Sequence, residues 1–65
     1  FSLTPRERGV VQLVAEGHSN KQVANVLNIG IKTVETHRAA VMRKLNMSST
    51  ASLVRYAVRN RLVEP

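Results

Sequence analysis

Two capping boxes near the start of the chain set the points at which its first helices begin. In Thr4-Pro5-Arg6-Glu7, threonine suits the N-cap, proline the first helical position, and glutamate the third, from which it reaches back to the cap. Ser19-Asn20-Lys21-Gln22 repeats this arrangement with glutamine in the third position. Gly17, between the two, favours a left-handed helix stop. The pattern predicts helices over residues 5–16 and 20–27.

The remainder of the chain also has helical spacing. Gly30 is the expected N-cap of a helix over residues 31–45, and Ser49 is the expected N-cap of a helix over residues 50–60. The β-branched residues recur at intervals of three and four rather than in alternation, so no strand is expected. The predicted fold class is all-α: a four-helix bundle that forms one domain over residues 1–65.

The predicted helix over residues 31–45 has two faces of different character. On one side apolar residues are expected to form core, and these are Val34, Val41 and Leu45, with His37 and Met42 beside them. The other side is polar, narrow and small enough for a groove, and it carries Lys32, Glu35, Thr36, Ala39 and Arg43. The expected inward residues of the neighbouring helices are Val23, Ala24, Val26 and Leu27, followed by Leu53, Val54 and Ala57.

Positive charge is concentrated in the second half of the chain. Ten lysines and arginines stand against four glutamates, which gives a formal net charge of +6. Residues 1–28 hold three basic and two acidic side chains, whereas residues 29–65 hold seven basic and two acidic ones. Such an excess is typical of a surface that meets a polyanion, although a cationic surface without a partner has the same composition.

Several classes of function lack the residues that they need. The chain has no cysteine, no aspartate and two histidines, so we expect no metal site, no cofactor and no catalytic triad. No apolar run approaches the ~20 residues of a membrane span. The absence of cysteine fits a reducing cytoplasm. Because Phe1-Ser2-Leu3 lacks an initiator methionine, we expect the chain to be a piece of a longer protein.

The two middle helices and the short turn between them have the pattern of a helix-turn-helix. Ala24 is small where the helices would cross, Asn28 tolerates the positive φ of a tight turn, and Val34 lies one turn into the second helix. In this motif the second helix lies in the major groove of DNA. A helical hairpin in an ordinary small bundle shares the local pattern, but the basic second half favours DNA binding.

Separated motifs along nearly the whole chain resemble the LuxR-type (GerE-like) helix-turn-helix domain. They are Leu3-Thr4-Pro5-Arg6-Glu7, Gly17, Asn20-Lys21-Gln22-Val23-Ala24, Leu27, Lys32-Thr33-Val34-Glu35-Thr36-His37, Lys44-Leu45 and Leu53-Val54-Arg55-Tyr56-Ala57. The amino-acid sequence of the third predicted helix is most similar to that of the FixJ/NarL-like response-regulator branch. The resemblance implies sequence-specific binding of double-stranded DNA by a C-terminal output domain of a bacterial transcriptional regulator, behind a phosphorylatable receiver domain. Gly30 departs from the serine common in the family, and lacks a hydroxyl that could donate to a phosphate.

The resemblance and the side-chain chemistry together give each candidate residue a role. The base-reading candidates are Lys32, Glu35, Thr36 and Ala39. The phosphate-contact candidates are Lys21, Thr33, His37, Arg38, Arg43, Lys44, Ser49 and Thr50. For Glu35, a salt bridge to Lys32 or Arg38 is the alternative role. The family typically dimerises through its last helix, which implies a homodimer on DNA with contact candidates Val54, Arg55 and Val58.

Two other classes of function stay open at this point. A protein-interaction module, for instance one that docks on RNA polymerase, needs large apolar or aromatic anchors, which the polar stripe lacks. A cationic membrane-surface peptide is disfavoured because tryptophan is absent and because capped helices favour a folded core. RNA binding is weakened by the shortage of aromatic stacking platforms. Double-stranded DNA is therefore the expected partner, with RNA polymerase as a further candidate.

Overall fold

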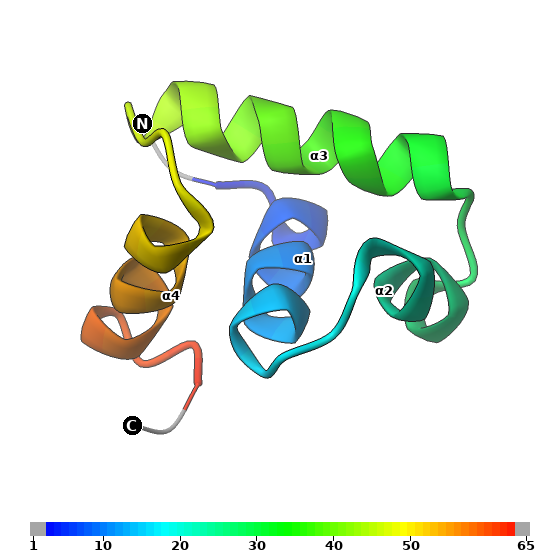
Figure 1. The fold of residues 1–65 in the computed structure, drawn as a ribbon, viewed down its shortest axis with the longest axis horizontal. Helices are drawn as coiled ribbons and strands as arrows, with labels where there is room; N and C mark the ends of the chain where they lie inside the picture. Colours follow the sequence, from blue (N-terminus) through cyan, green and yellow to red (C-terminus); the bar gives the residue numbers. More distant parts are fainter. Residues whose placement is uncertain (1–2, 64–65) are drawn as a thin grey trace.

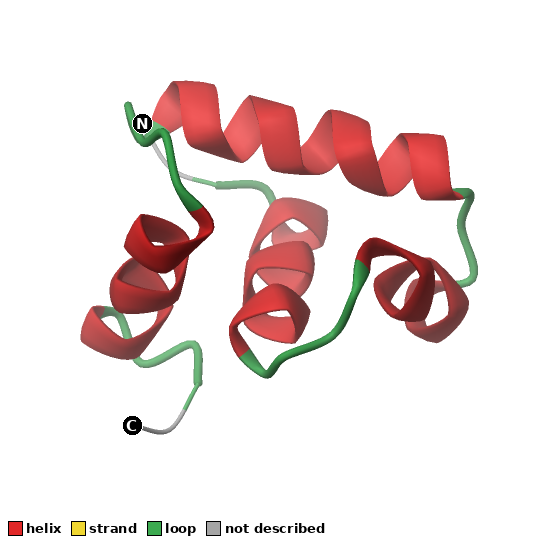
Figure 2. Ribbon diagram, viewed as in Figure 1, coloured by secondary structure: helices red, strands yellow, loops and turns green. Residues whose placement is uncertain are grey.

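The chain folds into helices joined by short connections. A computed structural model describes residues 3–63, and this part of the chain contains no strand (Figures 1 and 2). The helices are α1 (Pro5–Ala15), α2 (Asn20–Leu27), α3 (Ile31–Lys44) and α4 (Thr50–Arg59). The predicted all-α class and every predicted helix start are thereby confirmed. The expectations about the chain start at Phe1 and Ser2, and the charge of Glu64, lie outside the described residues.

Three helices end one residue earlier than predicted. At the C-cap residues the backbone ψ is close to zero rather than helical, as at Glu16 (ψ 0°), Leu45 (ψ 0°) and Asn60 (ψ 10°). The chain is already turning at these positions, because the next residue adopts a left-handed conformation. Apolar spacing alone does not register this change, since it extends unchanged across the last turn.

Side-chain caps begin three of the helices in the way that the sequence indicates. Thr4 Oγ1 accepts a hydrogen bond from the N–H of Glu7 at 3.1 Å, and Glu7 Oε1 accepts from the N–H of Thr4 at 2.9 Å. Ser19 and Gln22 form the same reciprocal pair at 3.2 Å and 2.8 Å. Ser49 Oγ accepts from the N–H of Ser52 at 3.1 Å. These bonds satisfy N–H groups that have no partner within a helix.

All four helices end in the same motif. Each is followed by a residue with positive φ, and these are Gly17 (99°), Asn28 (57°), Asn46 (54°) and Arg61 (59°). The next N–H then donates to a carbonyl five residues earlier: His18 to Leu13, Ile29 to Ala24, Met47 to Met42 and Leu62 to Ala57, at 2.8–3.0 Å. This is the Schellman arrangement, which directs the apolar residues Ile29, Met47 and Leu62 back onto the core.

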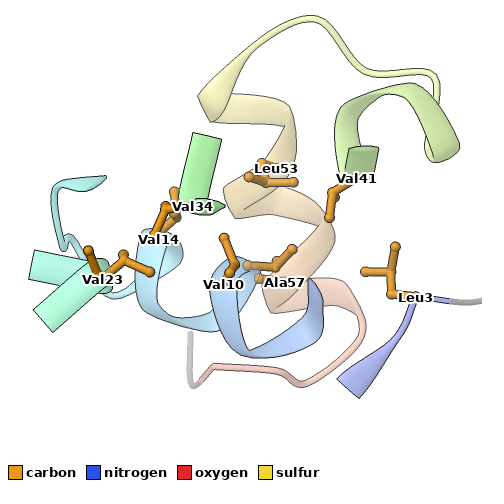
Figure 3. Packing of buried hydrophobic residues seen from close by; sticks show 10 residues of the cluster. Leu3, Val10, Val14, Val23, Val34, Val41, Leu53 and Ala57 are labelled. Carbon is orange, nitrogen blue, oxygen red and sulfur yellow. The ribbon is translucent and has the colours of Figure 1, made fainter. Parts of the chain in front are cut away.

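The core lies where α1 meets the other helices. Its buried residues are Leu3, Val10, Val11, Val14, Val23, Ala24, Val34, Val41, Leu53 and Ala57. Figure 3 shows side chains from all four helices converging there. The prediction that Val26 faces inward from α2 is wrong, because its side chain is 58% exposed. The inward arc of this short helix is filled by Val23, Ala24 and Leu27, and Val26 lies outside that arc.

The arrangement of the helices leaves one long side of α3 uncovered. In Figure 1, α3 runs along the top of the view, with α4, α1 and α2 side by side below it. Val34 and Val41 are fully buried and lie about two turns apart, so they anchor α3 along its inner side. The opposite side therefore faces solvent. No helix within residues 3–63 combines the length and apolar character needed to cross a bilayer.

The same substitution at two glycines is expected to have opposite effects on stability. A Cβ added at Gly9 or at Gly17 would meet no other atom within 4 Å, so the backbone conformation decides the result. Gly9→Ala in α1 is expected to raise the free energy of unfolding by about 0.5–1 kcal/mol, because alanine favours the helix. Gly17→Ala is expected to lower it by about 1 kcal/mol, because the site has a left-handed φ. Urea denaturation measures both, and a stabilising Gly17→Ala would contradict the proposed turn.

Candidate nucleic-acid interface

The outer side of α3 presents the stripe that the spacing predicts. We call it the groove face, and it consists of Lys32, Glu35, Thr36, Ala39 and Arg43, all of them exposed. It lies opposite the buried Val34 and Val41. The side chains of the groove face are charged, polar or small, and the exposed Ile31 lies one turn before Glu35 at the start of the helix. The exposure of the stripe is thus confirmed, while its contacts with bases stay a prediction.

Thr36 has its hydroxyl proton committed to the helix itself. The hydroxyl Oγ1 donates to the backbone carbonyl of Lys32 at 3.0 Å, one turn earlier. Such a bond is common for threonine within helices and uses the only donor of the side chain. Thr36 is left with a methyl group and hydroxyl lone pairs for an outside partner. A methyl group suits apolar contact with the methyl of thymine.

Glu35 is exposed and has no cation beside it. Within residues 3–63, the ion pairs at 4.0 Å or less join His18 to Glu16 and Lys44 to Glu7. The alternative role for Glu35, a salt bridge to Lys32 or Arg38, is therefore not observed. An exposed carboxylate in the middle of the groove face can accept a hydrogen bond from the amino group of cytosine.

Arg38 joins α3 to the starts of two other helices. Its Nη1 donates to Asn20 Oδ1 at 2.7 Å, and its Nη2 donates to Thr50 Oγ1 at 3.1 Å. The side chain is half-buried, unlike those of the groove face. Asn20 is the first residue of α2 and Thr50 is the first residue of α4. A residue predicted as a phosphate contact is thus also a link between three helices.

Lys44 is engaged inside the fold. Its Nζ donates to both carboxylate oxygens of Glu7, at 2.8 Å and 3.1 Å, and the Glu7 side chain is only 6% exposed. The hydrogen bond from Lys44 is the main cause that lowers the pKa of Glu7 below its usual value, and the N–H of Thr4 adds to it. We therefore assign Lys44 to the stability of the fold rather than to the proposed DNA contacts.

Glu7 is the residue whose importance the sequence analysis missed. It was assigned to the capping box only, yet it also pairs the start of α1 with the end of α3. A signal was present: Glu7 precedes Val10, Val11 and Val14 by three, four and seven residues, which places it on the core stripe. A carboxylate on a core stripe needs a partner. The sequence does not identify that partner, which lies 37 residues away.

The other phosphate candidates surround the groove face at exposed or half-buried positions. Lys21 lies in the first turn of α2, Ser49 and Thr50 lie at the start of α4, and all three are exposed. Thr33 is exposed in the first turn of α3, and His37 is half-buried. Helix starts offer backbone N–H groups and a partial positive charge, both of which favour anions.

The dimer candidates lie on α4, away from the groove face. Val54 and Val58 are half-buried and Arg55 is exposed. Val54 was expected to face the core, but Leu53 and Ala57 occupy that position and are fully buried. No three metal-ligating side chains come together among the described residues.

These features define a class of protein. A short α2, a left-handed turn at Asn28 and an α3 with one buried and one exposed face make a helix-turn-helix DNA-binding domain. The chain belongs to the LuxR family of bacterial regulatory proteins, because the family model described as "Bacterial regulatory proteins, luxR family" (GerE) matches residues 1–57. The resemblance seen in the sequence is thereby confirmed.

Curated relatives match most of this chain with a minor part of their own length. The tetrathionate response regulatory protein TtrR of Salmonella typhimurium is 49% identical over 53 residues, which cover 82% of this chain and 26% of that protein. The transcriptional regulatory protein MctR of Rhizobium johnstonii is 46% identical, with coverages of 94% and 28%. The oxygen regulatory protein NreC of Staphylococcus carnosus is 40% identical, with coverages of 95% and 29%. The chain thus spans little more than a quarter of the length of these relatives.

Glu7→Gln is expected to lower the thermal midpoint near pH 7. The difference in midpoint between this variant and the unsubstituted chain is expected to narrow in acid. The pKa of Glu7 is lowered in the folded protein, so its ionised form favours folding at pH values above the ordinary glutamate range. As the pH falls through the lowered pKa, the unsubstituted protein loses this contribution, whereas the glutamine variant has none to lose. Circular dichroism melts from neutral to acidic pH measure the difference. A difference that is constant with pH would contradict the ion pair.

Gly30→Ser is expected to stabilise the start of α3. Gly30 is the N-cap with φ −75° and ψ 155°, and it makes no side-chain hydrogen bond. A Cβ there would meet only Thr33 Oγ1, at 3.9 Å. Serine fits this backbone and supplies an acceptor, so the free energy of unfolding should rise by about 0.5 kcal/mol. Gly30→Ala is the control: it lacks the acceptor, and an equal gain in urea denaturation would contradict the capping explanation.

Proposed function

We propose that this chain binds double-stranded DNA sequence-specifically by placing the groove face of α3 in the major groove. The observation that carries the proposal is the division of α3 into two sides. Val34 and Val41 are fully buried, while the groove face is exposed along the same turns. A major groove about 12 Å wide admits a helix that carries short or flexible side chains. Membership of the LuxR family supports the same function.

Each residue of the groove face has a chemistry that suits a base pair or the backbone. Lys32, in the first turn of α3, suits the acceptors of guanine or a phosphate. Glu35 suits the amino group of cytosine, and Thr36 suits the methyl of thymine. Ala39 is small, which lets α3 lie deep in the groove. Together these residues would read a few adjacent base pairs.

Contacts with the phosphates would fix the orientation of the domain on the duplex. The residues that we propose for this role are Lys21, Thr33, His37, Arg43, Ser49 and Thr50. They lie on α3 and at the starts of α2 and α4. Because such contacts release counterions, binding should weaken steeply with salt.

We infer that the whole protein is a bacterial two-component response regulator in which this chain is the C-terminal output domain. TtrR and the uncharacterized response regulatory protein YgeK of Escherichia coli, 47% identical over 57 residues, support this by their names. The relatives are several times longer than the match, which accommodates a receiver domain upstream. Such a regulator works in the cytoplasm, where bacterial DNA is found.

A homodimer on DNA is the assembly that we propose. Val54 and Val58 leave apolar surface on α4, with the exposed Arg55 beside them. Two copies paired through this helix would read two half-sites about one helical turn apart. RNA polymerase is a candidate partner of the protein bound at a promoter.

Fluorescence anisotropy with a labelled mixed-sequence duplex tests the DNA-binding proposal. We expect binding in the micromolar range that weakens steeply as salt increases, since several phosphates are neutralised. Arg43→Ala is expected to weaken binding and to reduce the slope of log K against log salt by about 0.9, the contribution of one phosphate.

Arg59→Ala is the matched control for that substitution. Arg59 is also exposed, but it lies in the last turn of α4, at the end of that helix away from α3 (Figure 1). The same loss of charge there should change binding far less. Equal effects of Arg43→Ala and Arg59→Ala would contradict the placement of the DNA against α3. An absence of binding at low salt, with the helical circular dichroism intact, would contradict DNA binding and favour a protein-docking module.

A further inference from the structure

Arg38 contacts two helix starts that are built in the same way. α2 and α4 each follow a serine N-cap, Ser19 or Ser49, whose hydroxyl accepts the N–H of the third helical residue. The first residue of each helix, Asn20 or Thr50, is therefore not needed for capping. Both of these side chains instead accept a hydrogen bond from Arg38, at 2.7 Å and 3.1 Å. One guanidinium thus fixes the starts of two helices relative to the middle of α3.

The electrostatics of this arrangement oppose its hydrogen bonds. The N-terminal end of a helix carries a partial positive charge, and cations are disfavoured there. Arg38 places a full positive charge between two such ends, and no carboxylate within residues 3–63 forms an ion pair with it. The gain from two hydrogen bonds is thereby offset in the isolated domain. The contacts of Arg38 therefore stabilise the fold less than two unopposed hydrogen bonds would, and they fix the geometry of both helix starts.

We propose that Arg38 is a positioning residue for DNA binding, which acts by holding the starts of α2 and α4 at fixed places beside the groove face of α3. This inference rests on the proposed function. The starts of α2 and α4 carry Lys21, Ser49 and Thr50, which are proposed phosphate contacts. Figure 1 shows both starts directly below α3. If the starts of α2 and α4 shift relative to α3, the domain cannot make all its contacts with the DNA backbone at the same time.

The forked shape of the guanidinium is what this role requires. Arginine donates from two terminal nitrogens held in one plane, so it can reach Asn20 and Thr50 together. Lysine keeps the positive charge but has a single nitrogen on a flexible stem. Arg38→Lys therefore separates the positioning role from the charge. If Arg38 instead binds a phosphate directly, lysine should replace it well.

The test measures the binding of a labelled duplex by the 65-residue chain across a range of salt concentrations. Arg38→Lys is expected to weaken binding about tenfold, because the starts of α2 and α4 would then have to be ordered against the duplex when it binds. The thermal midpoint should stay close to that of the unsubstituted chain, because the fold is kept. Arg59→Lys, which changes an exposed arginine of α4, is the control and should bind the duplex as the unsubstituted chain does.

A double-substitution cycle completes the test. Asn20→Ala alone should weaken binding, but it should add no further loss to Arg38→Lys, because both remove the same link. Additive losses would overturn the proposal, as would normal binding by Arg38→Lys. A loss of affinity that is matched by a fall in the thermal midpoint would also overturn it, since the role would then be structural. If the unsubstituted chain binds no duplex, the proposed function itself fails. If it binds and Arg38→Lys binds equally well, only the positioning role fails.

Discussion

The burial of Val34 and Val41 is the constraint on which the functional surface of this domain depends. Both side chains are fully buried, and each such burial contributes about 1.5–3 kcal/mol. Because they lie about two turns apart on the same side of α3, the helix cannot rotate about its axis without exposing one of them. The opposite side is held toward solvent over the same length. At the far end of α3, the ion pair between Lys44 and Glu7 fixes the helix to the start of α1.

The basic residues of α3 are divided between the surface and the fold. Lys32 and Arg43 are exposed on the groove face, whereas Arg38 and Lys44 are half-buried and make hydrogen bonds to other helices. Net charge therefore overstates the number of cations that α3 can offer to an outside partner. The two inner cations have different partners: Lys44 meets a carboxylate, while Arg38 meets neutral acceptors at two helix starts. The first arrangement stabilises charge within the fold, and the second leaves positive charge beside a DNA-binding surface.

The uniform helix ends explain how so short a chain holds its helices in place. Four Schellman turns each return an N–H to a carbonyl of the last turn, and the residues after three of them pack on the core. The connections are consequently defined by hydrogen bonds rather than by length alone. Gly17, Asn28 and Asn46 suit the left-handed conformation, but Arg61 adopts it without such a preference, and no local pattern indicates this in advance.

The sequence by itself determined the helix starts, the all-α class, the polar stripe of α3 and the family. These follow from signals that act over three or four residues, such as the capping boxes, or from motifs that persist along the chain. Only the tertiary structure decided that Val26 lies outside the core, that Glu7 pairs with Lys44 and that Arg38 links Asn20 to Thr50. Glu7 and Lys44 are 37 residues apart, and Arg38 is 18 residues from Asn20 and 12 from Thr50. These side chains meet only when the packed helices bring them together. Local periodicity gives the direction of a side chain on its own helix, whereas the packing of the whole core determines which neighbour it meets.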